Sequence, residues 1–416
     1  MRPLLTLSLL LASAASAQDW SAWHGANFDG VAPDGDYPTE WSAETNVAWS
    51  VDLSGRGSST PAVHSGRVFL TDDLDGQNGL LCLNLSDGSE RWRKTVGRLV
   101  PPKHKKASGT NPSPVTDGER VFAYFKSGDL AAFTADGEPL WQTNIQKAYG
   151  ENTLWWDLGT SPVLTDEAVV VTVMQTGPSF LVAFDKQTGE LKWKADRDLG
   201  APEEAAQSYT TPAVVTHEGT QQLVVVGADH VTAHDAATGK ELWRVGGLNP
   251  SGDKFFRSIS SPAVGDGVVV APYARGETVT AIELGGSGDV TGSKKVLWSK
   301  EGVGSDVPTP VVAGGRVYVL GDKGKTGGVI WCLDLRGGEE LWTLRLPKAR
   351  HAYSSSPMLA GGKLYLTRED GATFVVDPEA RKVVATNQLG DATFATPAFA
   401  DGRVLLRTVS KLVCVE

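Results

Sequence analysis

One stretch of the sequence decides the fold: Ala183-Phe184-Asp185-Lys186-Gln187-Thr188-Gly189-Glu190-Leu191-Lys192-Trp193. The same pattern of Ala, Asp, Thr, Gly and Trp returns 50 residues later, over 233–243. In both copies an apolar strand ends at an Asp, which can accept hydrogen bonds from turn amides, and a Gly follows that can adopt the left-handed backbone conformation. A Trp then marks the beginning of another strand. Recurrence at this period indicates a repeat architecture.

A second recurring element is Ser or Thr followed by Pro and an apolar residue. It occurs eight times, at Pro61, Pro114, Pro162, Pro212, Pro262, Pro310, Pro357 and Pro397. Tryptophans stand at or near the start of the fourth strand of most repeats, at Trp49, Trp92, Trp141, Trp193, Trp243, Trp298 and Trp342. A four-stranded sheet cannot bury its own faces, and a flat indole can pack between adjacent sheets. The sequence therefore predicts an all-β fold, an eight-bladed β-propeller of four-stranded antiparallel blades.

The two ends of the repeat array predict how the ring closes. The eighth repeat offers three strands, at 396–399, 403–409 and 411–415, and the sequence then stops. A spare strand stands at 46–53, with Trp49 in the docking position. We expect this N-terminal strand to complete the last blade and to leave no unpaired sheet edge there. The seventh repeat has Val383 and Val384 where a Trp is expected.

The N-terminus has the pattern of an export signal. Arg2 precedes an apolar run at 4–11 and small residues at 12–17, which is typical of a signal peptide cleaved between Ala17 and Gln18. The expected organisation is a signal peptide at 1–17, an N-terminal extension at 18–45 and the propeller at 46–416. The product would be periplasmic or secreted, without membrane insertion. The formal charge of −10 argues against nucleic acid as a partner, and we expect a monomer.

The three cysteines have the contexts of core residues. Cys82, Cys332 and Cys414 each stand where other repeats have a small residue such as Ala183 or Ala233. Cys in such a position behaves as a small hydrophobic side chain. The sequence therefore predicts three buried free thiols rather than a disulfide.

These motifs resemble the pyrroloquinoline-quinone (PQQ)-like β-propeller repeat family over essentially the whole mature chain. The Ala-x-Asp-x-x-Thr-Gly-x-x-x-Trp signature is complete at 183–193 and 233–243 and partial elsewhere. The length and the lack of added domains are more similar to the scaffold branch of the family, exemplified by BamB, than to its dehydrogenases. The opening at 19–30 is similar to that of exported members from planctomycete-type bacteria. The resemblance implies a scaffold that engages another envelope component.

The lengths of the connections between strands predict which face of the ring binds a partner. Calling the strands of a blade A to D from the centre outward, the A–B and C–D turns lie on one face, and the B–C turns and D–A links on the other. The first set is short, except at 217–220 and 285–295, whereas the D–A links at 97–110, 146–158, 196–208 and 246–257 are long and varied. Loops that vary on one face suggest a binding face. The candidate residues there are Trp155, Trp156, Asp157, Tyr209, His230, Arg257, Tyr273, Arg275, Asp306, Tyr353, Arg368 and Asp370.

The sequence favours a non-catalytic scaffold that engages an envelope or extracellular protein, peptide or polymer. No catalytic, cofactor-binding or metal-ligating residue is predicted. Two alternatives stay open, a PQQ-dependent quinoprotein dehydrogenase with Ca²⁺ and a sensor for a small molecule or glycan. Against the first, the chain has no adjacent Cys pair to cover a quinone and no Cys-x-x-Cys-His haem attachment. Asp72, Asp73, Asp75 and Asn78 crowd one turn and offer Ca²⁺-type oxygens, but without the full EF-hand spacing.

Overall fold

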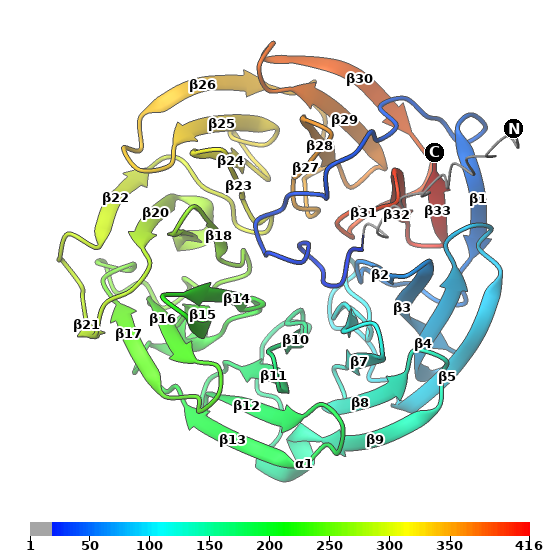
Figure 1. The fold of residues 1–416 in the computed structure, drawn as a ribbon. Helices are drawn as coiled ribbons and strands as arrows, with labels where there is room; N and C mark the ends of the chain where they lie inside the picture. The colour runs from blue at the N-terminus through cyan, green and yellow to red at the C-terminus, as the bar shows by residue number, and fades with distance from the viewer. Residues whose placement is uncertain (1–18) are drawn as a thin grey trace, which may run out of the picture.

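The computed structural model describes residues 19–416 as a ring of eight antiparallel sheets around a central channel (Figure 1). The signal peptide expected at 1–17 and its cleavage point lie outside the described residues. Each sheet runs from a short inner strand beside the channel to an outer strand at the rim. The eight-bladed propeller predicted from the repeats is therefore confirmed.

The blades are numbered in chain order, and each is given from its inner to its outer strand. Blades 1 to 4 consist of β2 (Ala62–His64), β3 (Arg67–Leu74), β4 (Gln77–Asn84) and β5 (Glu90–Arg98); β6 (Val115–Thr116), β7 (Arg120–Tyr124), β8 (Asp129–Thr134) and β9 (Pro139–Asn144); β10 (Val163–Leu164), β11 (Ala168–Val173), β12 (Phe180–Asp185) and β13 (Leu191–Asp196); and β14 (Ala213–His217), β15 (Thr220–Gly227), β16 (His230–Asp235) and β17 (Glu241–Val245).

Blades 5 to 8 consist of β18 (Ala263–Gly265), β19 (Val268–Tyr273), β20 (Thr278–Glu283) and β22 (Val296–Glu301); β23 (Val311–Ala313), β24 (Arg316–Leu320), β25 (Val329–Asp334) and β26 (Glu340–Arg345); β27 (Met358–Ala360), β28 (Lys363–Thr367), β29 (Ala372–Asp377) and β30 (Lys382–Gln388); and β31 (Ala398–Ala400), β32 (Arg403–Arg407), β33 (Lys411–Val415) and β1 (Val47–Asp52). Short helices α1 (Ile145–Tyr149) and η1 (Glu203–Ala206) lie in D–A links, and η2 (Ala274–Gly276) lies in a B–C turn.

Blade 8 closes the ring as predicted. β1 pairs antiparallel with β33, with Trp49 opposite Cys414 and Val51 opposite Leu412. The sheet therefore joins strands from the first and last parts of the sequence, and β1 and β33 lie side by side in Figure 1. The pairing removes the open edge that β33 would otherwise present.

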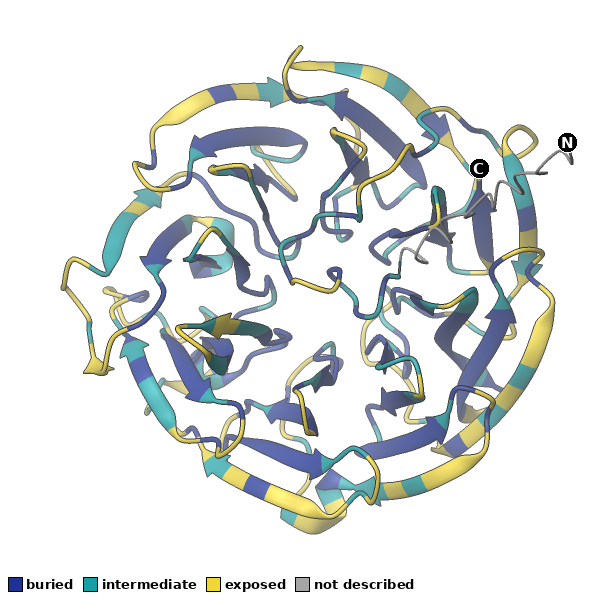
Figure 2. Cartoon of the chain, viewed as in Figure 1, coloured by how far each residue is buried: buried dark blue, intermediate teal, exposed yellow. Residues whose placement is uncertain are grey.

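Burial follows the position of each strand in its blade (Figure 2). The second and third strands are almost entirely buried, as in β11 and β12, because they face neighbouring blades on both sides. The outer strands alternate, as in β13, where Trp193 is buried and its neighbours are exposed. The hydrophobic core is thus a set of layers between blades rather than one central cluster.

Five tryptophans dock their blade on the next one through the same hydrogen bond. The Nε1–H of Trp193 donates to the carbonyl of Ala236, the residue after Asp235 in the next blade, at 3.2 Å. Gly239 of that turn lies under the indole, and a Cβ there would approach the ring to 2.4 Å. The same Trp-to-carbonyl bond joins Trp49 to Leu85, Trp92 to Ala135, Trp141 to Lys186 and Trp298 to Leu335. The repeated Gly therefore serves both the turn and the indole.

This docking explains why the seventh repeat lacks its Trp. The turn that a Trp of β30 would contact is the C–D turn of blade 8. Blade 8 has no such turn, because its outer strand is β1 and comes from the other end of the sequence. Val383 and Val384 occupy the position instead, half-buried and exposed respectively.

Two turns on the A–B/C–D face, at 217–220 and 285–295, were expected to be longer than the others, and only the second is. His217 pairs with Thr220 in a two-residue hairpin, so this A–B turn is as tight as the others and the expectation was wrong. The insertion at 285–295 does contain something new. It carries β21 (Gly288–Asp289), which pairs parallel with β17 and gives blade 4 a fifth strand.

The three cysteines are free and buried, as predicted. Each lies on the third strand of its blade, β4, β25 or β33, where the neighbouring blades exclude water. Burial raises the pKa of the Cys82 thiol to about 12. Among residues 19–416, no helix is long and apolar enough to cross a membrane.

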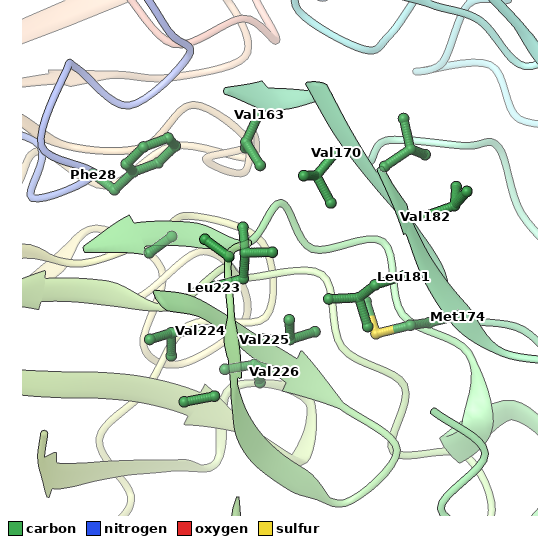
Figure 3. Packing of buried hydrophobic residues seen from close by; sticks show 14 of the residues in the cluster. Phe28, Val163, Val170, Met174, Leu181, Val182, Leu223, Val224, Val225 and Val226 are labelled. Atoms are coloured by element: carbon green, nitrogen blue, oxygen red, sulfur yellow. The ribbon is translucent and has the colours of Figure 1, made fainter. Parts of the chain in front are cut away.

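The N-terminal extension crosses the channel on the A–B/C–D face (Figure 1). Its backbone bonds to the ends of inner strands far apart around the ring, including Trp20 to Val63 and Ala32 to Leu359. Phe28 joins the buried cluster that contains Val163 and Leu223 of blades 3 and 4 (Figure 3). From the sequence, this segment was predicted only as an N-terminal extension at 18–45. In the structure it closes one end of the channel.

Candidate functional site

The Ser/Thr-Pro elements form a continuous hydrogen-bonded ring around the channel. In seven of the eight steps, the backbone N–H of one Ser or Thr donates to the side-chain hydroxyl of its counterpart in the next blade. These bonds run from Thr60 to Ser113, Ser161, Thr211, Ser261, Thr309, Ser356 and Thr396, at 2.8–3.0 Å. The Thr60 hydroxyl closes the circle by donating to the Thr396 carbonyl at 3.0 Å. Because all eight side chains are buried, this hydroxyl ring secures the inner strands.

The hydroxyl ring lies at the base of a cavity of about 510 Å³ on the D–A/B–C face, which we call the cup. All eight residues of the hydroxyl ring line it. Trp23, from the N-terminal extension, also lines it. The extension bonds near the opposite ends of the inner strands, so it closes the channel beneath the cup. The cup is thus a blind site rather than a tunnel through the ring.

The charged groups of the cup are arranged in ion pairs. Asp306 accepts two bonds from Arg257, at 2.8 and 3.1 Å, and a third from Lys323. Lys106 reaches Glu369 at 2.6 Å, although the two residues are 263 positions apart in the sequence. Such pairs hold the links and B–C turns of different blades in one arrangement.

Burial and ion pairing shift the pKa values of carboxyl groups in the cup in opposite directions. Burial raises the pKa of Asp306, but the paired cations Arg257 and Lys323 outweigh this and lower it below its usual value. Burial raises the pKa of neighbouring Asp322, which accepts a bond from the Asp306 N–H at 3.2 Å. A third carboxylate, Asp157, is buried and bonds the Lys103 and His104 amides and the Lys126 ammonium.

Three large aromatic side chains stand exposed beside the mouth of the cup. Trp155, Trp156 and Phe255 are each 45% exposed, and we call them the aromatic rim. Buried Glu204 accepts a bond from the Trp156 indole at 2.9 Å and another from Arg275 at 2.6 Å. Trp155 and Trp156 come from the link at 146–158 and Phe255 from the link at 246–257. Glu204 joins the two sides through Arg275, which also bonds the Phe255 carbonyl.

Further bonds fix the backbone of the aromatic rim. The Trp155 N–H donates to the Gln207 side chain at 2.9 Å, and the Trp156 N–H donates to the Tyr209 hydroxyl at 3.1 Å. Arg275 also donates to the Phe255 carbonyl at 2.7 Å. The aromatic faces are therefore exposed on a backbone that is held in place.

The structure divides the twelve candidate residues into three groups. Six line the cup, namely Trp156, Asp157, Tyr209, Arg257, Asp306 and Tyr353. Trp155 and Arg275 belong to the aromatic rim or to its support. The other four form local contacts away from the cup lining: Tyr273 and His230 bond Asp229 and the Ala228 carbonyl, and Arg368 pairs with Asp370.

The three candidate arginines have partners within the chain. Arg257 is bonded to Asp306, Arg275 to Glu204 and Arg368 to Asp370. They were predicted as candidate residues of the binding face, and in the structure they hold loops together.

The acidic turn in blade 1 has a structural explanation. Asp72 pairs with the buried Arg407 of blade 8, and the Asp73 side chain accepts a bond from the Gly76 N–H. Asn78 donates to the Val96 and Arg98 carbonyls. Across residues 19–416, no three His, Cys, Asp or Glu side chains gather in a way that could hold a metal ion.

Several residues that form the site were not predicted from the sequence. The Ser/Thr-Pro pattern was found at eight positions, but a ring of hydroxyls was not predicted from it. Trp23 lies in the opening at 19–30, for which no role was predicted, and Phe255 was not among the candidate residues. Glu204 lies in the link at 196–208 but was not among the candidate residues. The signals for these residues were the recurrence of the hydroxyl before each Pro and the presence of aromatic residues in polar links.

Solved structures with the same fold include a dehydrogenase and a BamB protein. A europium-containing methanol dehydrogenase superimposes with a TM-score of 0.72 at 13% identity, covering 95% of this chain and 90% of the other. BamB from Moraxella catarrhalis gives a TM-score of 0.62 at 16% identity, covering 88% and 95%. At these identities the likeness establishes the fold alone.

Similarity in sequence identifies the family more specifically than similarity in fold. The outer membrane protein assembly factor BamB of Yersinia pestis is 24% identical over 363 residues, 85% of this chain and 82% of its own length. The factor of the same name from Escherichia coli K12 is 26% identical over 375 residues, 87% of this chain and 86% of its own. The family model described as outer membrane protein assembly factor BamB matches residues 31–196, 154–329 and 325–416. The chain therefore belongs to the BamB family of PQQ-like repeat propellers.

Proposed function

We propose that this protein is an exported, non-catalytic scaffold of the bacterial envelope that binds a segment of another envelope protein on its D–A/B–C face. The aromatic rim is the observation that carries the proposal. Exposed tryptophans cost solvation free energy, and in interfaces they supply much of the binding energy. Relatives named as outer membrane protein assembly factors support an envelope protein as the partner.

The hydrogen bonds that hold the aromatic rim in place favour a binding role for these loops. Glu204 is buried and bonded to both Trp156 and Arg275, so little side-chain freedom is lost when a partner docks. Trp155 and Phe255 lie on two separate links beside these contacts of Glu204. An extended apolar or aromatic segment is the partner that such a rim would hold.

A quinone cofactor fits the cup poorly. PQQ is a tricarboxylate, and the cations Lys106, Arg257 and Lys323 are already paired with Glu369 and Asp306. Binding would compete with these pairs, and the Arg257–Asp306 pair is buried on both sides, so breaking it would leave a buried charge uncompensated. The three cysteines lie in three different blades, which gives no adjacent pair to cover a quinone ring. The proposed function therefore includes no catalytic step.

The test uses photo-crosslinking from the full mature protein in its native envelope. A photo-reactive residue at 155 or 255 should crosslink to the same envelope protein, and the double variant Trp155→Ala/Phe255→Ala should lose capture of that protein. The matched control is Leu191→Ala/Leu341→Ala, which removes exposed apolar side chains from outer strands. Melting curves for both variants separate binding from folding. Equal capture by the two variants at unchanged melting would refute the proposal.

A further inference from the structure

A second binding feature lies below the aromatic rim, at the base of the cup. Seven hydroxyls of the hydroxyl ring accept one bond each from a backbone N–H, and among the described residues none of them has an acceptor for its own proton. A hydroxyl carries one donor and two acceptor positions, so each retains capacity for a ligand. The ring therefore offers several neutral hydrogen-bonding groups around one axis.

The walls of the cup carry no excess of charge that would select an ion. Apart from His104, every charged side chain that lines it has an oppositely charged neighbour within 4.0 Å. These side chains and the Lys126 that pairs with Asp157 comprise four cations, Lys106, Lys126, Arg257 and Lys323, and four carboxylates, Asp157, Asp306, Asp322 and Glu369. A charged ligand would have to displace one of these partners, whereas a neutral ligand would not.

Aromatic surfaces complete the cup. Trp23, Trp156, Tyr209, Tyr353 and Phe394 all line it, so aromatic side chains stand both at its base and near its mouth. The face of an aromatic ring is electron-rich and attracts the weakly positive C–H groups of a ligand. Trp23 adds an indole N–H that is buried without an acceptor among residues 19–416. The buried Nε–H of Arg257 is likewise without a hydrogen-bond acceptor there.

We infer that the cup binds a neutral saccharide, such as the end of an uncharged envelope glycan. A sugar presents hydroxyls that donate and accept, which match the hydroxyl ring, and C–H faces, which match the aromatic side chains. The volume of about 510 Å³ is that of a small-molecule site. This site shares Trp156 with the aromatic rim, but Trp155 and Phe255 do not line the cup, so the two proposals can be tested separately.

The first experiment screens the mature protein against an array of neutral and acidic oligosaccharides and measures hits by calorimetry. A neutral sugar should bind saturably, and its counterpart with a uronic acid should bind at least tenfold more weakly. Retention of no neutral sugar, or a preference for the acidic counterparts, would overturn the inference.

Variants place the binding in the cup. Trp23→Phe removes the indole N–H but keeps an aromatic ring, and Thr211→Val removes one hydroxyl of the ring. Each should weaken sugar binding at least fivefold, whereas Thr211→Ser keeps the hydroxyl and should stay within twofold. If Thr211→Val does not fold, Trp23→Phe decides the question. Sugar binding unaffected by Trp23→Phe would place it outside the cup and contradict us.

The variant Trp155→Ala/Phe255→Ala distinguishes the two proposals. It should leave sugar binding unchanged while it abolishes protein capture. Loss of sugar binding in this variant, at unchanged melting, would show that the sugar sits on the aromatic rim and would overturn its assignment to the cup.

Discussion

The backbone N–H of Ser113 donates to the hydroxyl of Ser161 at 2.9 Å, across 48 residues of sequence and one blade of the ring. Both residues precede a proline at the start of an inner strand. The inner strands are short, two residues in β6 and in β10, so their own ladders provide few bonds. The hydrogen bond between blades compensates for the few ladder hydrogen bonds that these short strands form. This relationship explains why a hydroxyl precedes each of the eight prolines.

The first prediction removes one acceptor from the hydroxyl ring. Ser161→Ala should leave the buried Ser113 N–H unpaired and lower the free energy of unfolding by about 1–3 kcal/mol. Ser161→Thr keeps the hydroxyl and is the matched control. Thermal and urea unfolding of the two variants measure the difference. Equal stability would mean that the ring bond contributes nothing.

The second prediction concerns closure through β1. Trp49→Ala removes an indole that is 8% exposed and bonded to the Leu85 carbonyl at 2.8 Å. We expect a loss of about 3–5 kcal/mol, as for other buried aromatic truncations. Trp155→Ala, at an exposed Trp, should cost less than about 1 kcal/mol.

A deletion tests the same closure more severely. Removing residues 46–53 should leave β33 without its outer neighbour and expose a strand edge, which lowers solubility and raises sensitivity to proteases. A deletion protein that melts and resists proteolysis like the parent would contradict the role of β1 in closing the ring.

The fold could be predicted because its signals are local and repeated. The Asp-turn-Gly-Trp motif at 183–193 contains its own turn chemistry, and the eight Ser/Thr-Pro elements give the number of blades. The closure by β1 followed from counting strands. The position of Cys82 in a buried strand followed from comparison with Ala183. Each of these inferences needed only short segments and their period.

The site could be predicted only in part because its contacts join segments without a common pattern. Lys106 and Glu369 meet across the ring, and nothing in either segment identifies the other. The path of the N-terminal extension depends on contacts with inner strands of several blades. The face of the ring could be chosen from loop lengths, but the partners of Arg257 and Arg275 could not.

The third prediction concerns the thiols. Burial raises the pKa of Cys82 and Cys414 to about 12 and that of Cys332 to about 11, so none carries appreciable thiolate at pH 8. A thiol reagent should therefore react slowly with the native protein and find three thiols after denaturation without reductant. Single Ala substitutions should cost roughly 1–2 kcal/mol or less. A missing pair of thiols in the denatured protein would refute the prediction.

The last prediction concerns stability in mild acid. Burial lowers the pKa of His24 and of His234 from 6.5 to about 4. Between pH 6.5 and 4 the unfolded chain therefore binds more protons at these two positions than the folded chain does. Stability should be complete above pH 6.5 and fall as the pH decreases toward 4, by on the order of 3 kcal/mol for each histidine.

The histidine contribution is isolated by comparison with His24→Asn/His234→Asn. Carboxylates such as Asp306 also titrate in acid, but they are common to both proteins and cancel in the difference. The double variant will be less stable at pH 7, because His234 bonds the Gly239 carbonyl and the Thr232 hydroxyl. Its melting temperature should nevertheless fall less steeply between pH 6.5 and 4. Parallel curves across this range would show that neither histidine is held neutral by the fold.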